Sequence, residues 1–476
     1  MPSNLVYRVR ASSPQLQEGL ARIADEQHLP GEFPPDVLAA AEHAAASVTL
    51  PELDRTDLPL LTIDPAGSMD LDQAMCLQRD ADGFVVHYAI ADVAAFVEPG
   101  GPIDVEAHHR GETLYGADTR IPLHPPVLSE NAASLLPDQE RPALLWTIRL
   151  DPDGAITDIH VERARVRSTA RWSYVDAQAS LDGGTAPEVI ALLAEVGRLR
   201  EKREAARGGV SLALPEQEVE EQDGSFSLGF REQLPVEGWN AQISLLTGMA
   251  AARLMVDGKV GMLRTLPPPD PRDVVRLRRV AQALRIDWPE GLDYPGFVRG
   301  LDPRAPAHQA MTVACTRLLR GSGYTAFDGE LPEQREQSAI GAEYAHATAP
   351  LRRLGDRYVG EVCVALCAGR PVPDWVTTAL PGLPKILAGS AQRAHTYERA
   401  VADLVEAGVL AGRVGETFDG VVTSVEDKDP TRGVLMVGEV GVEAPVTAAS
   451  DLPLGHDVTA TLAVADLATR KVEFRL

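Results

Sequence analysis

The stretch at residues 61–74 reads LTIDPAGSMDLDQA and constrains this chain most, because it places three aspartates within nine residues. Its apolar start predicts a strand, and the Pro-Ala-Gly-Ser segment at 65–68 predicts a turn that folds Asp64 back toward Asp70 and Asp72. Side chains two apart share a face of a strand, so Asp70 and Asp72 are expected to point the same way. Three neighbouring carboxylates repel one another unless a cation compensates them, and Mg²⁺ prefers oxygen ligands. The sequence therefore predicts a divalent-cation site here, with a solvated acidic turn as the alternative.

The same stretch resembles the T-I-D-x-x-x-[SA]-x-D-[LMI]-D-D-A motif of the catalytic (RNB) domain in the ribonuclease II family of 3′-to-5′ exoribonucleases. It departs at Gln73, where the family has a fourth Asp. The resemblance continues through HYAIADV at 87–93 and much later through YAHATAPLRRLGD at 344–356. It covers about residues 50–405. It implies a hydrolase that degrades single-stranded RNA stepwise to nucleoside 5′-monophosphates.

The resemblance also implies roles for the acidic residues. Asp64 and Asp70 are expected to bind Mg²⁺, with Mn²⁺ as the alternative ion, and Asp72 to bind the metal and activate water. Gln73 is expected to coordinate through its carbonyl oxygen, which brings no charge to the site. Two divalent ions held by carboxylates can stabilise both the attacking and the leaving oxygen of a phosphodiester.

Other residues take roles in catalysis and RNA binding from their places in the family motifs. Arg352 matches the catalytic arginine, whose planar guanidinium suits a bidentate grip on phosphate. Tyr115 aligns with an aromatic residue that stacks on a base, and stacking accepts any base. The expected catalytic set is Asp72, Arg352, Asp70 and Gln242, and the expected RNA-binding set is Tyr115, Arg110 and Arg353. His124 and His346 are interpreted as a loop histidine and a structural histidine.

Two glutamines keep a second class of function open. Gln73 replaces a family acid, and Gln242 aligns with a position where many members carry a catalytic Glu. Losing two charges around one site would weaken the cation or change its preference. The alternative to an exoribonuclease is therefore a catalytically impaired RNA-binding or regulatory protein with the same fold. A DNA-directed nuclease is a third, weaker interpretation.

The net charge of −24 over 476 residues argues against an RNA partner only superficially. Net charge governs solubility and long-range steering, whereas a channel can be positive locally. Three arginine sets at strand, helical and motif spacing could line such a channel: Arg163, Arg165 and Arg167; Arg272, Arg276 and Arg279; and Arg352, Arg353 and Arg357. Solvated faces with salt bridges are the alternative for the first two sets.

The chain has the composition of a cytoplasmic protein. No apolar run approaches the roughly 18 residues that a membrane span needs, and the N-terminus lacks a basic-then-apolar signal pattern. The four cysteines are scattered, which suits a reducing compartment: Cys76, Cys315, Cys363 and Cys367. We expect single-stranded RNA as the partner, no membrane, and a monomer.

The predicted fold class is α+β in three parts. Residues 1–48 form a small helical unit, with helix-turn-helix among its candidate forms, in place of the cold-shock barrels that precede the catalytic domain in many bacterial members. Residues 49–410 form the RNB catalytic domain, with strands at 84–90, 144–150 and 156–166 and helices at 187–207, 239–256, 271–284, 305–319, 350–368 and 391–410. Residues 411–476 resemble an S1 RNA-binding barrel of five strands. Residues 413–476 carry 11 acidic and 6 basic residues and only two aromatics, Phe418 and Phe474, so we expect a weak RNA grip.

Overall fold

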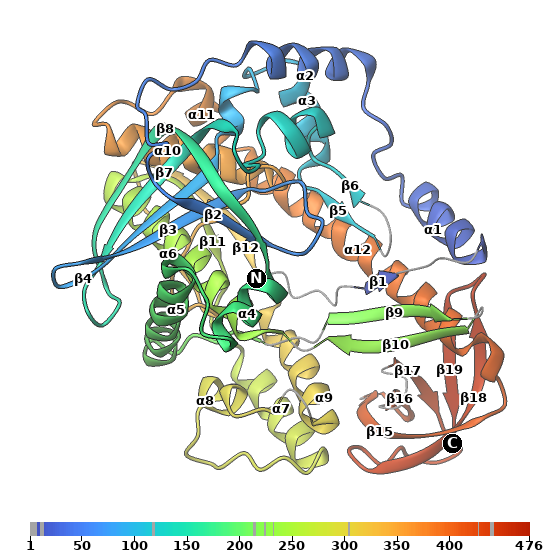
Figure 1. Ribbon diagram of the computed structural model, residues 1–476. Coiled ribbons are helices and arrows are strands. Elements are labelled where there is room, and N and C mark those ends of the chain that lie inside the picture. Colours follow the sequence, from blue (N-terminus) through green and yellow to red (C-terminus); the bar gives the residue numbers. More distant parts are fainter. Residues whose placement is uncertain are drawn as a thin grey trace.

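The computed structural model describes residues 7–9, 14–116, 120–212, 216–222, 225–231, 233–302, 305–426, 428–437 and 442–476. Helices and strands are mixed, and two closed five-stranded barrels lie at different ends of the molecule (Figure 1). This confirms the predicted α+β class.

The first barrel belongs to the predicted catalytic part and has the strand order β2-β3-β4-β7-β8. Neighbouring strands are antiparallel except for β2 and β8, which are parallel. Every residue of β4 after Gly83 is buried, because one face lines the barrel and the other meets helices. The strands are β2 (Leu60–Asp64), β3 (Gln73–Asp80), β4 (Gly83–Ala91), β7 (Glu140–Leu150) and β8 (Ile156–Ser173).

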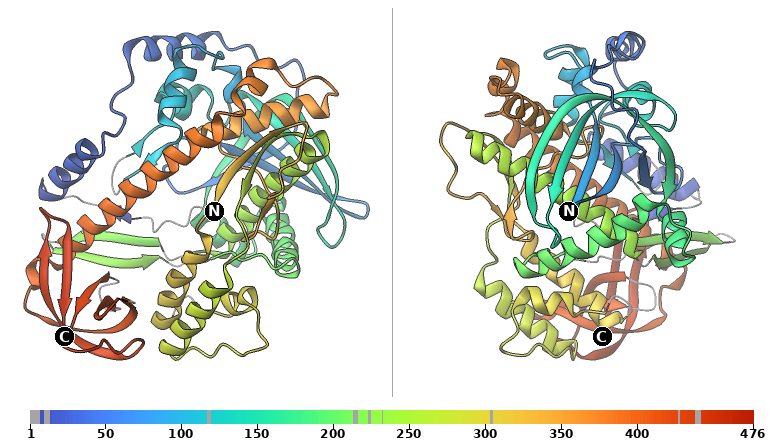
Figure 2. Two further views of the ribbon diagram at one scale, coloured as in Figure 1. Left: turned by 180° about the vertical axis from the view of Figure 1, so that it is seen from behind. Right: turned by 60° about the vertical axis from the view of Figure 1, so that its left-hand side comes forward.

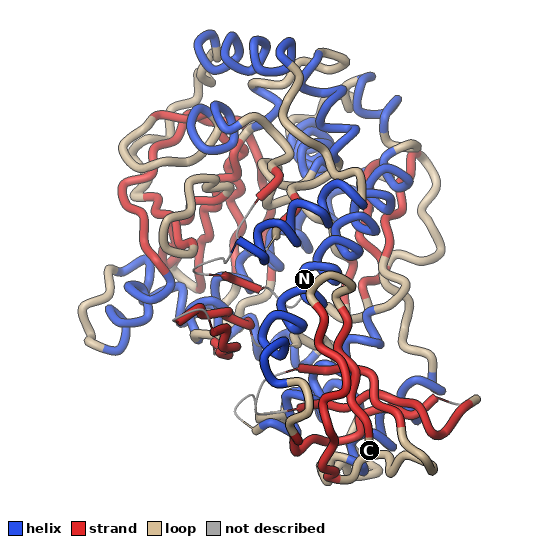
Figure 3. The backbone as a smooth tube through the Cα atoms, turned by 90° about the vertical axis from the view of Figure 1, so that its right-hand side faces the viewer, coloured by secondary structure: helices blue, strands red, loops and turns tan. Residues whose placement is uncertain are grey.

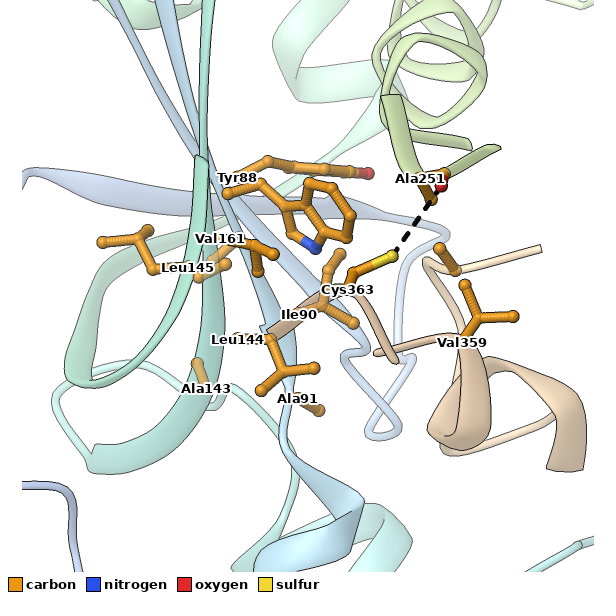
Figure 4. Close-up of a cluster of buried hydrophobic side chains, with 14 of the residues drawn as sticks. Tyr88, Ile90, Ala91, Ala143, Leu144, Leu145, Val161, Ala251, Val359 and Cys363 are labelled. Atoms are coloured by element: carbon orange, nitrogen blue, oxygen red, sulfur yellow. Dashed lines mark hydrogen bonds between the residues drawn. The ribbon is translucent and has the colours of Figure 1, made fainter. Parts of the chain in front are cut away.

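Helices α6 (Pro235–Gly258) and α10 (Leu354–Cys367) pack against this barrel. Figure 4 shows the apolar cluster where they meet it, with the Cys363 thiol directed to the Ala251 carbonyl at 3.8 Å. The approach is close at Gly360, where a Cβ atom would lie 2.5 Å from Leu144 Cδ1. Close packing of α10 fixes the position of the segment that precedes it, and this segment carries Arg352.

The second barrel is C-terminal and closes in the order β15-β16-β17-β19-β18. It confirms the predicted five-stranded OB-type fold and appears as the group of strands near the C-terminus in Figure 3. Phe418 and Phe474 are each 1% exposed and meet edge to face in its core, with ring centroids 5.7 Å apart. Both aromatics therefore serve packing. The strands are β15 (Thr417–Glu426), β16 (Asp429–Val437), β17 (Val442–Thr447), β18 (Asp457–Asp466) and β19 (Lys471–Arg475).

Helix α12 (Leu383–Leu410) runs as one long helix from the first part of the molecule to the C-terminal barrel (Figure 2). The N-terminal helix α1 (Pro14–Glu26) packs on α12, where Leu20 and Ile23 join one apolar cluster. Helix α2 (Pro35–Ser47) instead contacts α3 (Pro102–Arg110) and contributes to the main core. The two predicted N-terminal helices are thus present, and each packs on a different element. The boundaries at residues 48 and 410 stay a prediction.

The remaining elements complete the chain. Helices α7 to α9 and η3 form a layer with its own apolar core. The helices are α4 (Tyr174–Asp182), α5 (Glu188–Ala206), α7 (Pro271–Ala283), α8 (Tyr294–Arg299), α9 (Pro306–Cys315), α11 (Asp374–Ala379), η1 (Val93–Ala95), η2 (Leu128–Ala132), η3 (Thr316–Leu319) and η4 (Ala411–Arg413). The strands are β1 (Tyr7–Val9), β5 (Leu114–Tyr115), β6 (Arg120–Ile121), β9 (Glu216–Gln222), β10 (Ser225–Arg231), β11 (Val260–Thr265), β12 (Gly323–Asp328), β13 (Glu336–Gln337) and β14 (Ala342–Glu343).

Several expectations need adjustment. The helix predicted from residue 350 begins at Leu354, because the preceding segment is a loop that meets the aspartates. The helix predicted at 305–319 is divided into α9 and η3. Asp70 and Asp72 lie in the loop before β3, which begins at Gln73. Within the described residues, no helix is both long and apolar enough to cross a membrane.

The arginines expected to line a channel are in part engaged in ion pairs. Arg163 pairs with Asp92 and Glu361, and Arg165 pairs with Asp54. Arg272 pairs with Asp270, and Arg357 is buried against Asp104. For these residues the salt-bridged alternative describes the structure.

Candidate active site

Asp64 ends β2, and Asp70 and Asp72 lie in the loop that follows the turn. Gly67 adopts a φ of +86°, which favours glycine, and the Ser68 N–H donates to the Pro65 carbonyl at 3.1 Å. Leu71 is fully buried, and its N–H donates to Ser134 Oγ at 2.9 Å. Leu71 therefore anchors the loop that carries Asp70 and Asp72.

Asp72 is the most enclosed of the three aspartates, with 5% of its surface exposed. Its Oδ1 accepts the Leu351 N–H at 2.8 Å, and its Oδ2 lies 3.3 Å from Arg352 Nε. Burial raises the pKa of Asp72 to about 7, although Arg352 and the Leu351 N–H oppose the rise. The two family motifs therefore meet in space at one carboxylate and one guanidinium.

Asp64 and Asp70 lie beside this pair. Burial raises the pKa of Asp64 to about 7 against the opposing effect of Arg352, and the charge of Asp70 raises it further. Arg352 is thus shared between two desolvated carboxyl groups, Asp64 and Asp72. Arg171 on β8 also lowers the pKa of Asp64, so arginines oppose the desolvation of both carboxyl groups.

The donor set suits a hard cation, although its oxygens are not gathered as a coordination shell. Among the described residues, no group of three His, Cys, Asp or Glu side chains is positioned to hold a metal. Asp70 instead pairs with Arg120, with its Oδ2 2.6 Å from Nη1. Carboxylate oxygens are the ligands that Mg²⁺ prefers. The residue types therefore suit a divalent ion, but Asp70 would have to break its ion pair with Arg120 to bind that ion.

Gln73 is not free to act as a ligand. Its Nε2 donates to the Thr348 carbonyl at 2.6 Å, and its Oε1 accepts the Tyr88 hydroxyl at 2.7 Å. Both ends of the amide are therefore occupied by protein groups.

Gln242 is placed away from the aspartates. It is 3% exposed, and its Nε2 donates to Glu204 on α5. On the same helix, Asn240 reaches the Tyr174 hydroxyl and Ser244 reaches the Tyr88 hydroxyl, and both tyrosines are coupled electrostatically to Asp64. Residues two apart on a helix point to nearly opposite sides, so Asn240 faces the site and Gln242 does not. The structure does not support a catalytic role for Gln242.

Tyr115 lies beside the charged cluster. Its ring is 42% exposed, and its pKa is raised by burial and affected by Arg352, Asp70, Asp72 and Arg120. A half-open aromatic ring next to the carboxylates is available for stacking on a base.

The structure does not support the RNA-binding roles predicted for Arg110 and Arg353. Arg110 is 2% exposed, and its guanidinium donates to Glu106 and to the carbonyls of Gly31 and Pro122. Arg353 makes a bidentate pair with Asp356, whose Oδ1 also accepts the Ala349 N–H at 2.8 Å. The guanidinium groups of both arginines therefore donate to protein groups around the site and stabilise the fold there.

Sequence reasoning missed three side chains of the site: Arg120, Arg171 and Tyr88. Arg120 reaches Asp70 from β6, outside the three motifs that carry the family resemblance. Arg171 lowers the pKa of Asp64 from β8, and its Nη1 donates to the Ser68 carbonyl at 3.0 Å. Arg171 lies far from Asp64 in the sequence, so the sequence gave no sign that the two residues are close. Burial holds the pKa of His124 and His346 well below the usual range, and His346 Nδ1 lies 2.8 Å from the Tyr324 hydroxyl oxygen.

Comparison with known proteins agrees with this geometry. Residues 53–367 match the RNB domain, and residues 416–476 match the RNase II-type exonuclease C-terminal S1 domain. Ribonuclease R of Escherichia coli (strain K12) is 28% identical over 406 residues, which cover 78% of this chain and 48% of that protein. The chain thus spans about half the length of this curated relative.

Two solved structures share the fold at low identity. Mycoplasma genitalium RNase R, in complex with ribose methylated single-stranded RNA, superposes with a TM-score of 0.85 at 19% identity and covers 97% of this chain and 78% of that chain. Yeast Ssd1, described as a pseudonuclease, superposes with a TM-score of 0.70 at 15% identity and covers 96% of this chain and 58% of that chain. The same fold therefore occurs in a nuclease and in a pseudonuclease.

Proposed function

The chain belongs to the RNB-domain family, and from this premise we propose that it is a Mg²⁺-dependent exoribonuclease that hydrolyses single-stranded RNA from the 3′ end to nucleoside 5′-monophosphates. The observation that carries the proposal is the meeting of Asp72 and Arg352, at 3.3 Å, beside Asp64 and Asp70. Carboxyl groups with raised pKa values beside a half-exposed arginine are typical of functional sites.

Arg352 binds the phosphate that reacts. Its side chain is 42% exposed although it contacts the enclosed Asp72, so part of the guanidinium remains open to a substrate. Its N–H groups can hold two phosphate oxygens, and this grip strengthens as negative charge grows in the transition state.

Asp72 handles the proton of the attacking water. Its Oδ1 accepts the Leu351 N–H, and its Oδ2 faces Arg352. A carboxylate in this position can accept a proton from water bound beside it. A divalent ion held by Asp64, Asp70 and Asp72 would supply the positive charge for the phosphate and lower the pKa of the water. Tyr115 orients the terminal nucleotide by stacking on its base.

The variant Asp72→Asn tests the proposal. Asparagine keeps an oxygen for the Leu351 N–H but cannot take a proton or add charge, so we expect hydrolysis to fall by at least about 100-fold. The assay follows shortening of a labelled single-stranded RNA in Mg²⁺ or Mn²⁺, with binding measured separately in EDTA. Asp158→Asn on the exposed side of β8 is the matched control. Full activity of Asp72→Asn would contradict the assigned site.

A non-catalytic RNA-binding protein is the second candidate. The amides at Gln73 and Gln242 favour it, as does the shared fold with a protein described as a pseudonuclease. Absence of shortening by the wild-type chain in both metals, with RNA binding retained, would select this candidate. An all-DNA oligomer in parallel tests the choice of nucleic acid, because RNA is distinguished by its 2′-hydroxyl.

A further inference from the structure

Gln73 connects two parts of the site through its side-chain amide. It is the first residue of β3, paired with Ile90 on β4. Its Nε2 donates to the Thr348 carbonyl at 2.6 Å. Its Oε1 accepts the hydroxyl of Tyr88, which is fully buried and also contacts Ser244 Oγ at 2.9 Å.

The contact with Thr348 matters because Thr348 begins the segment that carries Arg352. This segment, residues 348–352, is held by two consecutive residues of the opposite motif. Asp72 accepts the Leu351 N–H, and Gln73 donates to the Thr348 carbonyl. The segment is thus held at the Leu351 N–H by Asp72 and at the Thr348 carbonyl by Gln73. These two hydrogen bonds set the position of Arg352 relative to Asp72.

An acid at position 73 could not make the same contact. An ionised carboxylate only accepts hydrogen bonds, so it would face the carbonyl oxygen of Thr348 without a proton between them. Thr348 is 3% exposed, and a buried carbonyl that loses its donor costs about 1–3 kcal/mol. The surroundings of position 73 therefore select an amide.

We propose that Gln73 is a positioning residue that holds the segment 348–352 so that Arg352 stays beside Asp72, and that it is not a metal ligand. The inference rests on the proposed function, because it assigns the cation to Asp64, Asp70 and Asp72. The glutamine that departs from the family motif then holds the loop, and the cation keeps three acidic ligands.

Three variants separate a positioning residue from a ligand. Gln73→Met keeps the length of the side chain without its hydrogen bonds, and Gln73→Glu keeps the length and adds a charge. Tyr88→Phe removes the hydroxyl that contacts Gln73 Oε1 and Ser244 Oγ and leaves the Thr348 contact. Gln78→Met, at an exposed position of the same strand, is the matched control for the methionine substitution.

The measurements are kcat and KM for a labelled single-stranded RNA, the half-saturating Mg²⁺ concentration, and Mg²⁺ binding to the RNA-free protein by calorimetry. For Gln73→Met and Gln73→Glu we expect kcat to fall about tenfold or more, and KM and the calorimetric Mg²⁺ affinity to stay within about threefold. Thermal unfolding confirms that each variant folds. Tyr88→Phe should lower kcat less than Gln73→Met does, because the Thr348 contact remains.

Two results would overturn the inference. One is tighter Mg²⁺ binding by Gln73→Glu together with weaker binding by Gln73→Met, which identifies a ligand. The other is a wild-type kcat in both Gln73 variants. Failure of the proposed function would look different, since the wild-type chain itself would then not shorten RNA in either metal.

Discussion

The ion pair between Arg120 and Asp70 predicts how tightly the site takes a divalent cation. The pair is 2.6 Å long, with 27% and 16% of the two side chains exposed, and Arg120 also pairs with Glu130. A cation that takes Asp70 as a ligand must break this pair. A hydrogen bond to a charged group contributes about 1.5–3 kcal/mol. Because Arg120 would keep Glu130, we take the lower end, about 1.5 kcal/mol, which corresponds to roughly tenfold in an equilibrium constant.

Arg120→Met removes this competitor. Calorimetric titration of Mg²⁺ into the RNA-free protein should give a Kd about tenfold lower than that of the wild type. Arg167→Met, at an exposed position of β8, removes the same net charge and is the matched control. Equal or weaker Mg²⁺ binding by Arg120→Met would refute the reasoning, because it would mean that Asp70 does not exchange Arg120 for the cation.

Two further predictions concern Arg352 and His124. Arg352→Lys keeps a positive charge near Asp72 but loses the planar guanidinium that can hold two phosphate oxygens. The kcat should therefore fall about 100-fold, while RNA affinity stays within about threefold of the wild type. An unchanged kcat would contradict the role of Arg352. His124 is buried, and its pKa in the folded protein is lowered to about 3 from 6.5. The unfolded chain therefore binds this proton first on acidification, so the contribution of His124 to stability falls by about 2 kcal/mol between pH 7 and pH 5. Urea unfolding should therefore show that the change in unfolding free energy from pH 7 to pH 5 is about 2 kcal/mol more favourable in His124→Gln than in the wild type, and the same change in both proteins would contradict the prediction.

Much of the fold could be predicted from local patterns. Local apolar runs and helical periodicity predicted β4, β7, α5 and α6 within four residues at each end, whereas β8 extends seven residues beyond its predicted end. The turn at 65–68 was predictable because Gly67 supplies the positive φ that it needs. Helix boundaries were less predictable. Residues 350–353 have helix-compatible types, yet tertiary contacts with Asp72 hold them as a loop.

The sequence by itself determined the chemistry of the site: three acidic residues after a strand and an arginine in a distant motif, in a chain of mixed helices and strands. Only the tertiary structure decided which side chains face that site. Arg110 and Arg353 donate hydrogen bonds to other protein groups, and Gln242 donates to Glu204 on α5. Arg120 instead lies in the site as the ion-pair partner of Asp70. The physical reason is that residue type sets what a group can bind, whereas packing between segments far apart in sequence sets what it meets.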